Sequence, residues 1–570
     1  MRARAARPAP QAGSLNATTT TGSAGAQVVL GTINARYQHA SLGLRYLLAN
    51  AGDLQPHTVI EELVSGRPVA EMAHRLLLHR PRIVGLGVYI WNVVETTALV
   101  RRLKELAPSV SIVLGGPEVS HEADRQEVCG LADFVIQGPG DISFARLARA
   151  ILHGPKPLMR VIAGEQPDLA ELALPYRLYT DRDLRERSIY VEASRGCPFK
   201  CEFCLSALDK TAWAFPLAPF LTEMAALYAR GARRFKFVDR TFNLKPATSL
   251  AIMQFFMAKI EAAPADPCFV HFELVPDHLP DSVKALIGRF PAGTLQFEIG
   301  IQTFEPAVQA LISRRQDNER AEANLRWLRA SSKAHLHVDL IAGLPGESLD
   351  SFGRGVDRLF AIGPDEIQIG ILKRLRGAPI VRHEHPQGLR FHPRPPYEVV
   401  GTATMNEQEL VAIKLMARFH DLVVNARRMP RLASLVLADR PFARLMDMSQ
   451  DLSLRFGRTH SIPLEQLFDG VVDWLRKDHS LEAAVLERQA LEDYRASGAR
   501  GRLSFMRRGL SGGRHPPDAA SAPPGCTVAK ASATPNTPNT PLRQARHLRS
   551  TDPASAQVAH AIDTAGPGVL

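Results

Sequence analysis

The chain has 570 residues, of which 45 % are hydrophobic, and this length implies more than one globular domain. It contains no apolar run of about 18 residues or more, so we expect no transmembrane helix and no membrane partner. The formal net charge is +11, but the excess falls in the terminal segments. The central part is near neutral, which argues against a nucleic-acid partner.

Residues 1–25 carry Arg2, Arg4 and Arg7, no acidic residue and many Thr, Ala and Ser, without the apolar core of a signal peptide. We predict a disordered leader here, although a transit peptide can have the same composition. From residue 509 to 570 the chain is rich in Pro, Ala, Thr and Ser, and such a segment buries too little apolar surface to fold. We therefore predict a disordered tail.

Residues 26–160 alternate short β-rich runs with helical stretches, which predicts a doubly wound, flavodoxin-like α/β domain. Glycine-rich turns follow two late strands, at Gly115-Gly116 and at Gly138-Pro139-Gly140. Ligands of such sheets bind at the carboxyl ends of the strands, where these turns lie. The predicted strands are Val28–Ile33, Thr58–Leu63, Ile83–Val88, Ser111–Leu114 and Phe134–Gln137.

A Pro-containing linker is expected over residues 161–186, and a second β/α series over 187–392. Six β/α units in this stretch predict an open, partial (β/α)6 barrel rather than a closed eightfold one. Residues 393–508 lose the strand pattern and predict an α-helical C-terminal domain. The six predicted barrel strands are Ile189–Ala193, Phe235–Val238, Val270–Leu274, Leu295–Ile299, Leu336–Ile341 and Ile367–Ile371.

Cys197, Cys201 and Cys204 form a C-x3-C-x2-C motif directly after the first of these strands. Cysteine thiolates hold iron–sulfur clusters, normally four per cubane, so three local ligands leave one iron open to a substrate or cofactor. Zinc is the alternative, but a structural zinc site needs a fourth protein ligand, and no second Cys or His pair lies nearby in the sequence. We therefore predict a [4Fe–4S] cluster at these cysteines.

Clustered thiols in a long chain without a signal peptide indicate a metal site in a reducing compartment rather than a disulfide scaffold. We accordingly predict a cytoplasmic protein. The three isolated cysteines are expected to be inert: Cys129, Cys268 and Cys526.

With the aromatic Phe203 before its last cysteine, the motif resembles the signature of the radical S-adenosylmethionine (SAM) superfamily. The resemblance implies a cluster whose open iron is chelated by SAM. One electron then breaks a carbon–sulfur bond, and the 5′-deoxyadenosyl radical abstracts a substrate hydrogen. It also implies an electron donor such as flavodoxin or ferredoxin. The six-unit β/α series fits the partial barrel of that family.

Further stretches resemble landmarks that contact SAM in this family, and they give Phe203, Asp239, Glu298, Gln302 and Gly343 as candidate SAM-binding residues. Asp239 ends the second barrel strand, Glu298 and Gln302 lie at the end of the fourth, and Gly343 follows the fifth. Polar groups at strand ends can point into a barrel mouth, and glycine lets the backbone approach a ring closely. The catalytic residues themselves stay unassigned.

A doubly wound domain ahead of such a barrel resembles the cobalamin (vitamin B12)-binding subfamily. The resemblance implies that Gly115, Gly116, Gly138 and Gly140 make room for the nucleotide tail of cobalamin. The Asp-x-His-x-x-Gly motif of proteins that ligate cobalt through histidine is absent, since the loop reads Tyr-Gln-His-Ala-Ser-Leu-Gly over residues 37–43. We therefore expect base-off cobalamin without a protein ligand, and His39 as an ordinary loop residue.

The sequence thus predicts a cobalamin-binding radical SAM enzyme that carries out radical chemistry, with methyl transfer as one form of it, on a small-molecule substrate. One alternative is a radical SAM methylthiotransferase, which needs three further N-terminal cysteines, whereas residues 1–160 contain only Cys129. The other is a non-catalytic cobalamin or redox sensor, which needs an output module that the sequence does not reveal.

Overall fold

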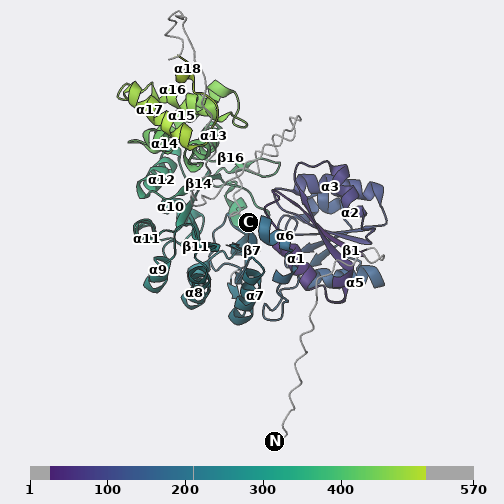
Figure 1. Cartoon of the computed structure of the whole chain (residues 1–570). Coiled ribbons are helices and arrows are strands. Elements are labelled where there is room, and N and C mark those ends of the chain that lie inside the picture. Colours follow the sequence, from purple (N-terminus) through teal and green to yellow (C-terminus); the bar gives the residue numbers. More distant parts are fainter. Residues whose placement is uncertain (1–25, 210, 509–570) are drawn as a thin grey trace, which may run out of the picture.

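The computed structural model describes residues 26–209 and 211–508. Two parallel sheets of six strands each organise this part of the chain, and a group of helices follows them (Figure 1). The predicted fold class is confirmed: a doubly wound domain, a partial barrel and a helical C-terminal region.

The first sheet has the strand order β2-β1-β3-β4-β5-β6, and every pair in it is parallel. All seven residues of β1 are buried, because helices cover both faces of the sheet. The strand order reverses between β1 and β3, where the following loops diverge and leave a crevice. The strands are β1 (Val28–Asn34), β2 (Thr58–Val64), β3 (Ile83–Gly87), β4 (Ser111–Gly115), β5 (Phe134–Gln137) and β6 (Val161–Ala163).

Two hydrophobic clusters hold the helices on this sheet. One face packs against α1 (Leu42–Ala49) and α5 (Ser143–His153) through residues such as Leu44 and Phe144. The other face packs against α2 (Val69–Leu77), α3 (Val93–Leu106) and α4 (Glu127–Leu131), with Leu99 fully buried. Figure 1 shows α2 and α3 on the opposite side of the sheet from α1 and α5.

The segment expected as a linker is more structured than its composition indicates. Its first residues form β6, which extends the first sheet, and its last form α6 (Asp181–Glu186), which Thr180 caps. Asp183 of α6 accepts a hydrogen bond from Arg45 of α1 at 2.9 Å. Arg187 lies 2.6 Å from Glu62 of β2. These buried ion pairs fix the barrel to the first domain.

The second sheet has the order β14-β13-β12-β11-β10-β7, and every pair is again parallel. Helices α7 (Leu217–Ala229), α8 (Pro246–Ala262), α9 (Asp281–Ile287), α10 (Pro306–Leu311), α11 (Asn318–Ser331) and α12 (Leu349–Ile362) connect its strands. Strand β12 is longer than predicted because it continues through an irregularity between Gly300 and Gln302. The strands are β7 (Ile189–Val191), β10 (Arg234–Phe237), β11 (Phe269–Leu274), β12 (Leu295–Gln302), β13 (His335–Ala342) and β14 (Glu366–Ile371).

A short antiparallel pair, β15 (Arg390–Phe391) and β16 (Val399–Gly401), which the sequence pattern did not predict, lies at the junction of the barrel and the C-terminal region. The later helices share one hydrophobic core with the barrel, as the ring pair Phe352–Phe442 shows. The helices are α13 (Glu407–His420), α14 (Pro430–Val436), α15 (Pro441–Phe456), α16 (Leu464–Leu475), α17 (Ala483–Ala496) and α18 (Ser504–Arg508). Within the described residues, no helix is both long and apolar enough to cross a lipid bilayer.

Candidate active site at the carboxyl ends of both sheets

The three motif cysteines lie in a loop whose two ends are joined by a pair of short strands. Strands β8 (Ser194–Arg195) and β9 (Trp213–Ala214) pair antiparallel on either side of this loop. Gly196 has φ +81°, and a Cβ atom there would collide with the carbonyl oxygen of Thr211, so the turn into the motif requires glycine. The loop conformation therefore depends on local sequence as well as on the cysteines.

All three cysteines are free thiols and line a common cavity of about 150 Å³. Burial raises the pKa of the Cys197 thiol to about 11, so its thiolate needs a cationic partner such as iron. Across residues 26–209 and 211–508, no three His, Cys, Asp or Glu side chains converge on one metal-ion position. A cubane takes each thiolate on a different iron, so its ligands need not converge in this way. The donor set fits a three-cysteine cluster.

Glu202, between two of the cysteines, anchors the loop to the barrel. Its carboxylate is almost fully buried and accepts hydrogen bonds from Ser313 Oγ at 2.5 Å and from Arg382. His383 Nε2 lies 2.8 Å from its other oxygen. Two segments, each more than 100 residues away in the sequence, thus hold the cysteine loop in place. The sequence did not indicate the role of Glu202, because a carboxylate between two cysteine ligands is expected to be exposed to solvent.

Three of the five candidate SAM residues, Phe203, Glu298 and Gln302, line the cysteine cavity. The Oε1 atom of Gln302 is buried without a hydrogen-bond partner in the described structure, which leaves an acceptor that a ligand can use. Burial by itself would raise the pKa of Glu298, but His271 and Lys236, 3.2 and 3.4 Å away, hold it well below its usual range. Glu298 is therefore a charged carboxylate in the wall of the cavity.

The structure places the other two, Asp239 and Gly343, outside the lining of this cavity. Asp239 accepts hydrogen bonds from Ala193 N at 3.0 Å and Ser194 Oγ at 2.6 Å, so it supports the strand that leads into the cysteine loop. Gly343 has φ +84°, and a Cβ atom there would meet Val399 and Leu410 of the C-terminal region. Both residues thus have a structural role here, and their contact with SAM stays a prediction.

Glu347, four residues after Gly343, is a buried carboxyl group that makes stability depend on pH. Its side chain accepts a hydrogen bond from Thr303 Oγ1 at 2.6 Å, and burial raises its pKa from 4.5 to about 8. The folded state therefore binds a proton that the unfolded state releases between these values. We expect the free energy of unfolding to fall by about 1.4 kcal/mol per unit as pH rises from about 5 to 8. Glu347→Gln should flatten this slope in denaturant titrations; an unchanged slope would contradict the assignment.

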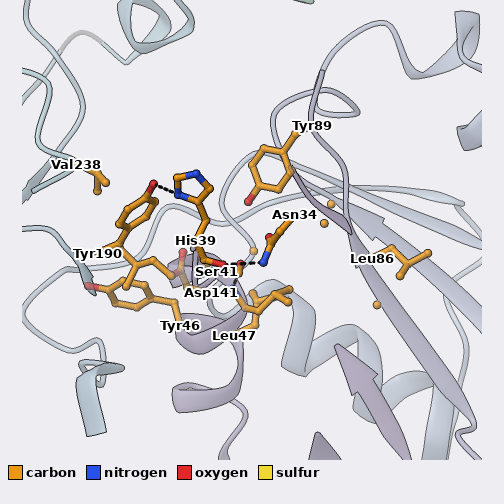
Figure 2. A pocket seen from close by; sticks show the side chains of 18 of the residues that line it. Asn34, His39, Ser41, Tyr46, Leu47, Leu86, Tyr89, Asp141, Tyr190 and Val238 are labelled. Carbon is orange, nitrogen blue, oxygen red and sulfur yellow. Dashed lines mark hydrogen bonds between the residues drawn. The ribbon is translucent and has the colours of Figure 1, made fainter. Parts of the chain in front are cut away.

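A second and larger cavity, of about 510 Å³, lies between the first domain and the barrel. Its walls include the loops after β1, β3, β4 and β5, which diverge at the reversal of strand order. All four candidate cobalamin residues line it: Gly115, Gly116, Gly138 and Gly140. Figure 2 shows Asn34 and Tyr89 entering this cavity from the first domain and Tyr190 and Val238 from the barrel.

Gly115, Gly116, Gly138 and Gly140 form one part of the cavity wall, which we call the glycine cradle. Free space lies above it. A Cβ atom built at Gly115 or Gly138 would meet no other atom within 4 Å. Ser120 fixes the two glycine turns to each other, because its hydroxyl donates to Gly116 O at 2.8 Å and accepts from Gly138 N at 3.1 Å. Side chains at these positions would fill the space, so the cradle fits a bulky group such as the nucleotide tail of cobalamin.

His39 also lines the cavity, where its Nδ1 atom lies 2.5 Å from the hydroxyl of Tyr190 (Figure 2). Burial, with a contribution from Lys236, lowers the pKa of His39 to about 4, so the imidazole is neutral. The contact joins the first domain to β7 of the barrel. The structure thus gives His39 a bridging role, whereas cobalt binding without a protein ligand stays a prediction.

Arg240 and Glu273 line both cavities, so the two spaces share a wall. Arg240 Nη1 lies 3.4 Å from Glu273 Oε1. Burial raises the pKa of Glu273 to about 8, although Arg240 acts in the opposite direction. Sequence reasoning missed both residues, since only the barrel brings the ends of β10 and β11 together at this wall. The same ion pair therefore borders both cavities.

Arg314 is a further residue that the sequence reading missed. It follows β12 and α10, and its Nη1 atom donates to Cys201 Sγ at 3.6 Å, while its Nε and Nη2 atoms donate to Gln316 Oε1. The guanidinium therefore brings a positive charge next to a cysteine of the motif. A basic residue a few positions after a helix carries no sequence signal of this placement.

Arg195, two residues before Cys197, connects the cysteine loop to the glycine cradle. Its guanidinium binds Asp141 in a bidentate pair of 3.0 and 3.1 Å and donates to Glu192 at 2.8 Å. It also lies 4.5 Å above the ring of Tyr46. Asp141 directly follows the Gly138–Gly140 turn, so one side chain couples the positions of the two cavities.

Asp141→Asn should loosen this connection without removing any cofactor ligand. The charge of Arg195 would then be offset by Glu192 alone, and we expect a loss of about 1–2 kcal/mol of domain docking. Amide hydrogen exchange over residues 194–204 should become faster, and cobalamin affinity should fall about tenfold. Glu105→Gln, in the exposed pair with Arg102, is the control and should leave both measurements unchanged. Unchanged exchange in Asp141→Asn would show that the pair does not couple the loops.

Comparisons with known proteins support this division of the site. Residues 28–148 match the family model of the B12 binding domain, and residues 191–359 match that of the Radical SAM superfamily. The chain is 25 % identical over 473 residues to "Cobalamin-dependent radical SAM methyltransferase TokK" from Streptomyces tokunonensis. This match covers 75 % of the chain and 66 % of TokK, so the chain spans just under two thirds of that relative.

Two proteins of known structure, TsrM and OxsB, are similar in fold to the chain. TsrM, a radical SAM methyltransferase from Kitasatospora setae with cobalamin and a [4Fe–4S] cluster bound, gives a TM-score of 0.54 at 16 % identity, over 75 % of this chain and 100 % of TsrM. A second TsrM structure contains tryptophan substrate and a SAM analog, with a TM-score of 0.52 at 17 % identity, over 67 % and 80 % of the two chains. OxsB, with aqua-cobalamin bound, gives 0.56 at 13 % identity, over 82 % and 80 %.

The glycine cradle lies within the residues matched by the first family model, and the cysteine loop lies within those matched by the second. The two family matches agree with the cofactors predicted from the sequence, with cobalamin in the first domain and SAM and its [4Fe–4S] cluster in the barrel. The chain therefore combines an N-terminal B12 binding domain with a domain of the Radical SAM superfamily.

Proposed function

We propose that this enzyme transfers a methyl group from SAM to a small-molecule substrate in a cobalamin-dependent reaction. The observation that carries the proposal is the wall that the two cavities share, because Arg240 and Glu273 border both of them. When bound, the cluster supplies the electron that cleaves SAM, and cobalamin supplies a methyl carrier. The names of TokK and TsrM, both described as radical SAM methyltransferases, support the same reaction class.

The residues of the chain contribute binding and orientation. The three cysteines of the motif and Gln302 would hold the cluster and SAM in the smaller cavity. Gly115 and Gly138 leave room for the cobalamin tail in the larger one. Arg195 keeps these two binding regions in a fixed relation through Asp141. Such positioning is the main contribution a protein makes when cofactors carry the reactive groups.

The substrate class follows from the enclosure of the site. The larger cavity is bordered by both domains and has a volume in the range of small-molecule pockets. TsrM was solved with tryptophan as its substrate, which is also a small molecule. We further propose that a flavodoxin or ferredoxin supplies the electron and that the enzyme works in the reducing cytoplasm, where its thiols stay reduced.

The test is product analysis with anaerobically reconstituted, reduced enzyme and SAM that carries a ¹³C-labelled methyl group. Protein loaded with cobalamin should form both 5′-deoxyadenosine and S-adenosylhomocysteine, whereas cobalamin-free protein should form 5′-deoxyadenosine alone. A labelled methyl group should then appear in one small molecule of a cell extract. If S-adenosylhomocysteine never depends on cobalamin, methyl transfer through that cofactor is excluded.

A further inference from the structure

The larger cavity contains six charged side chains, and five of them form ion pairs with one another. Arg195 pairs with Asp141 and Glu192, and Arg240 pairs with Glu273. The sixth is Lys373, in the segment that follows β14. In the part of the chain that the structure describes, no ion pair joins the Lys373 ammonium to a carboxylate. The cavity therefore contains one cation without a direct partner.

The position of Lys373 is fixed by its backbone. Leu372 O accepts from Val399 N at 2.8 Å, and Arg374 N donates to Tyr397 O at 2.9 Å, so Lys373 lies opposite Glu398 in an antiparallel bridge. The segment lies at the carboxyl end of the last barrel strand, the end at which barrel enzymes bind their substrates. The ammonium is thus held beside the cavity by a regular structure rather than by a free loop.

The charges around Lys373 do not balance. Glu398, the residue opposite, is bound by Lys414 through a 2.5 Å contact to its Oε2 atom. Lys414 thus occupies the carboxylate that lies opposite Lys373, which leaves one positive charge in excess. Burial, together with Lys414, lowers the pKa of Lys373 against the opposing effect of Glu398. A desolvated cation of this kind is stabilised when an anion enters the cavity.

The neighbouring cations behave differently. Arg374 Nη2 lies 3.0 Å from Glu122, and Arg376 Nε lies 2.9 Å from Glu118, both in the first domain. These two arginines fasten the segment across the domain boundary. Lys373, one residue earlier, faces the cavity instead. Residues 373–376 therefore do two things: the two arginines bind the first domain, and the ammonium group of Lys373 is accessible to a ligand in the cavity.

We propose that Lys373 binds an anionic group of the substrate, a carboxylate or a phosphate, and so selects acidic small molecules. This inference rests on the proposed function, since it places the substrate in the cavity shared by the two domains. Lys373 acts as a specificity-determining residue at the barrel side of that cavity. The neutral cradle around Gly115 and the paired arginines leave no other free cation among the described residues that line the cavity.

Inorganic phosphate is a suitable probe, because the natural substrate need not be known. Equilibrium dialysis of labelled phosphate against the holoenzyme, loaded with cluster, SAM and cobalamin, should show one saturable site. Lys373→Gln should weaken binding about tenfold or more, and Lys373→Arg should restore most of it. Glu398→Gln should strengthen binding, since it removes the competing carboxylate. The exposed Lys333 provides the control, and Lys333→Gln should bind phosphate like the wild type.

The outcomes separate the possible sources of the anion. Wild-type protein without saturable binding, or Lys373→Gln that binds phosphate as tightly as wild type, would overturn the proposal. Cobalamin has a phosphate in its nucleotide tail, whereas cobinamide lacks that tail. If Lys373→Gln lowers affinity for cobalamin but not for cobinamide, Lys373 binds the cofactor, and the substrate assignment is wrong. Failure of the proposed methyl transfer would appear separately, as absent S-adenosylhomocysteine in protein that still binds phosphate.

Discussion

Replacing Cys197, Cys201 and Cys204 together by alanine should abolish both the iron–sulfur cluster and the cleavage of SAM. Reconstituted wild-type protein should contain about four iron and four sulfide per chain, from the stoichiometry of a cubane held by three cysteines. The variant should contain neither, because all three thiols of the cavity are removed. Iron and sulfide assays together with the low-temperature paramagnetic resonance spectrum of the reduced protein provide the measurement.

The isolated cysteines supply the control for this experiment. Cys129 and Cys268 are buried in hydrophobic clusters, where burial raises the pKa of each thiol to about 11. Single alanine variants of these residues and of Cys526, which lies outside the described residues, should keep the full iron content. Iron that persists in the triple variant would refute the cluster assignment, whatever the single variants show.

Gly115→Leu should strongly weaken cobalamin binding while the protein stays folded. Gly115 lines the larger cavity, and a Cβ atom there would meet nothing within 4 Å, so the new side chain fits the protein but occupies the space of the ligand. We expect cobalamin affinity to fall about 100-fold, comparable to the cost of overfilling a packed site. Absorbance titration with hydroxocobalamin measures the affinity, and circular dichroism checks the fold.

Gly130→Leu is the matched control, because Gly130 also has open space around its Cβ position but lies in α4, away from the cavity. It should bind cobalamin like the wild type. Gly116, the other glycine of the same turn, is a less suitable position for this test. Its φ is +108°, and a Cβ atom would lie 2.5 Å from Val88 O, so a side chain there would distort the chain before it reached a ligand. Normal cobalamin binding by Gly115→Leu would exclude the cradle as the site of the nucleotide tail.

We predict that the two terminal segments are not required for folding or for SAM cleavage. Removal of residues 1–25 and 511–570 should leave folding and SAM cleavage intact, because these segments contain few large apolar side chains. Both segments lie outside the described residues. An insoluble or inactive truncated protein would show that one of them packs against the rest of the chain.

The sequence by itself determined the features that depend on short stretches of chain. The β/α alternation predicted both parallel sheets, and most of the predicted strands agree with the observed bounds to within a residue or two. The cysteine motif could be recognised in the sequence because its three ligands lie within eight residues, and this short spacing alone brings them to one cavity. The glycine turns could also be recognised in the sequence, since each of them directly follows a predicted strand.

Only the tertiary structure decided which distant residues meet at the site. Arg195 binds Asp141, 54 positions away, and Arg376 binds Glu118, 258 positions away. Lys373 reaches a cavity formed mostly by the first 240 residues. Such contacts depend on how two sheets dock, and no local periodicity records this docking. For the same reason the sequence did not show that Asp239 and Gly343, which match cofactor-binding landmarks, also support backbone segments, because packing against the cysteine strand and the C-terminal region determines where their atoms lie.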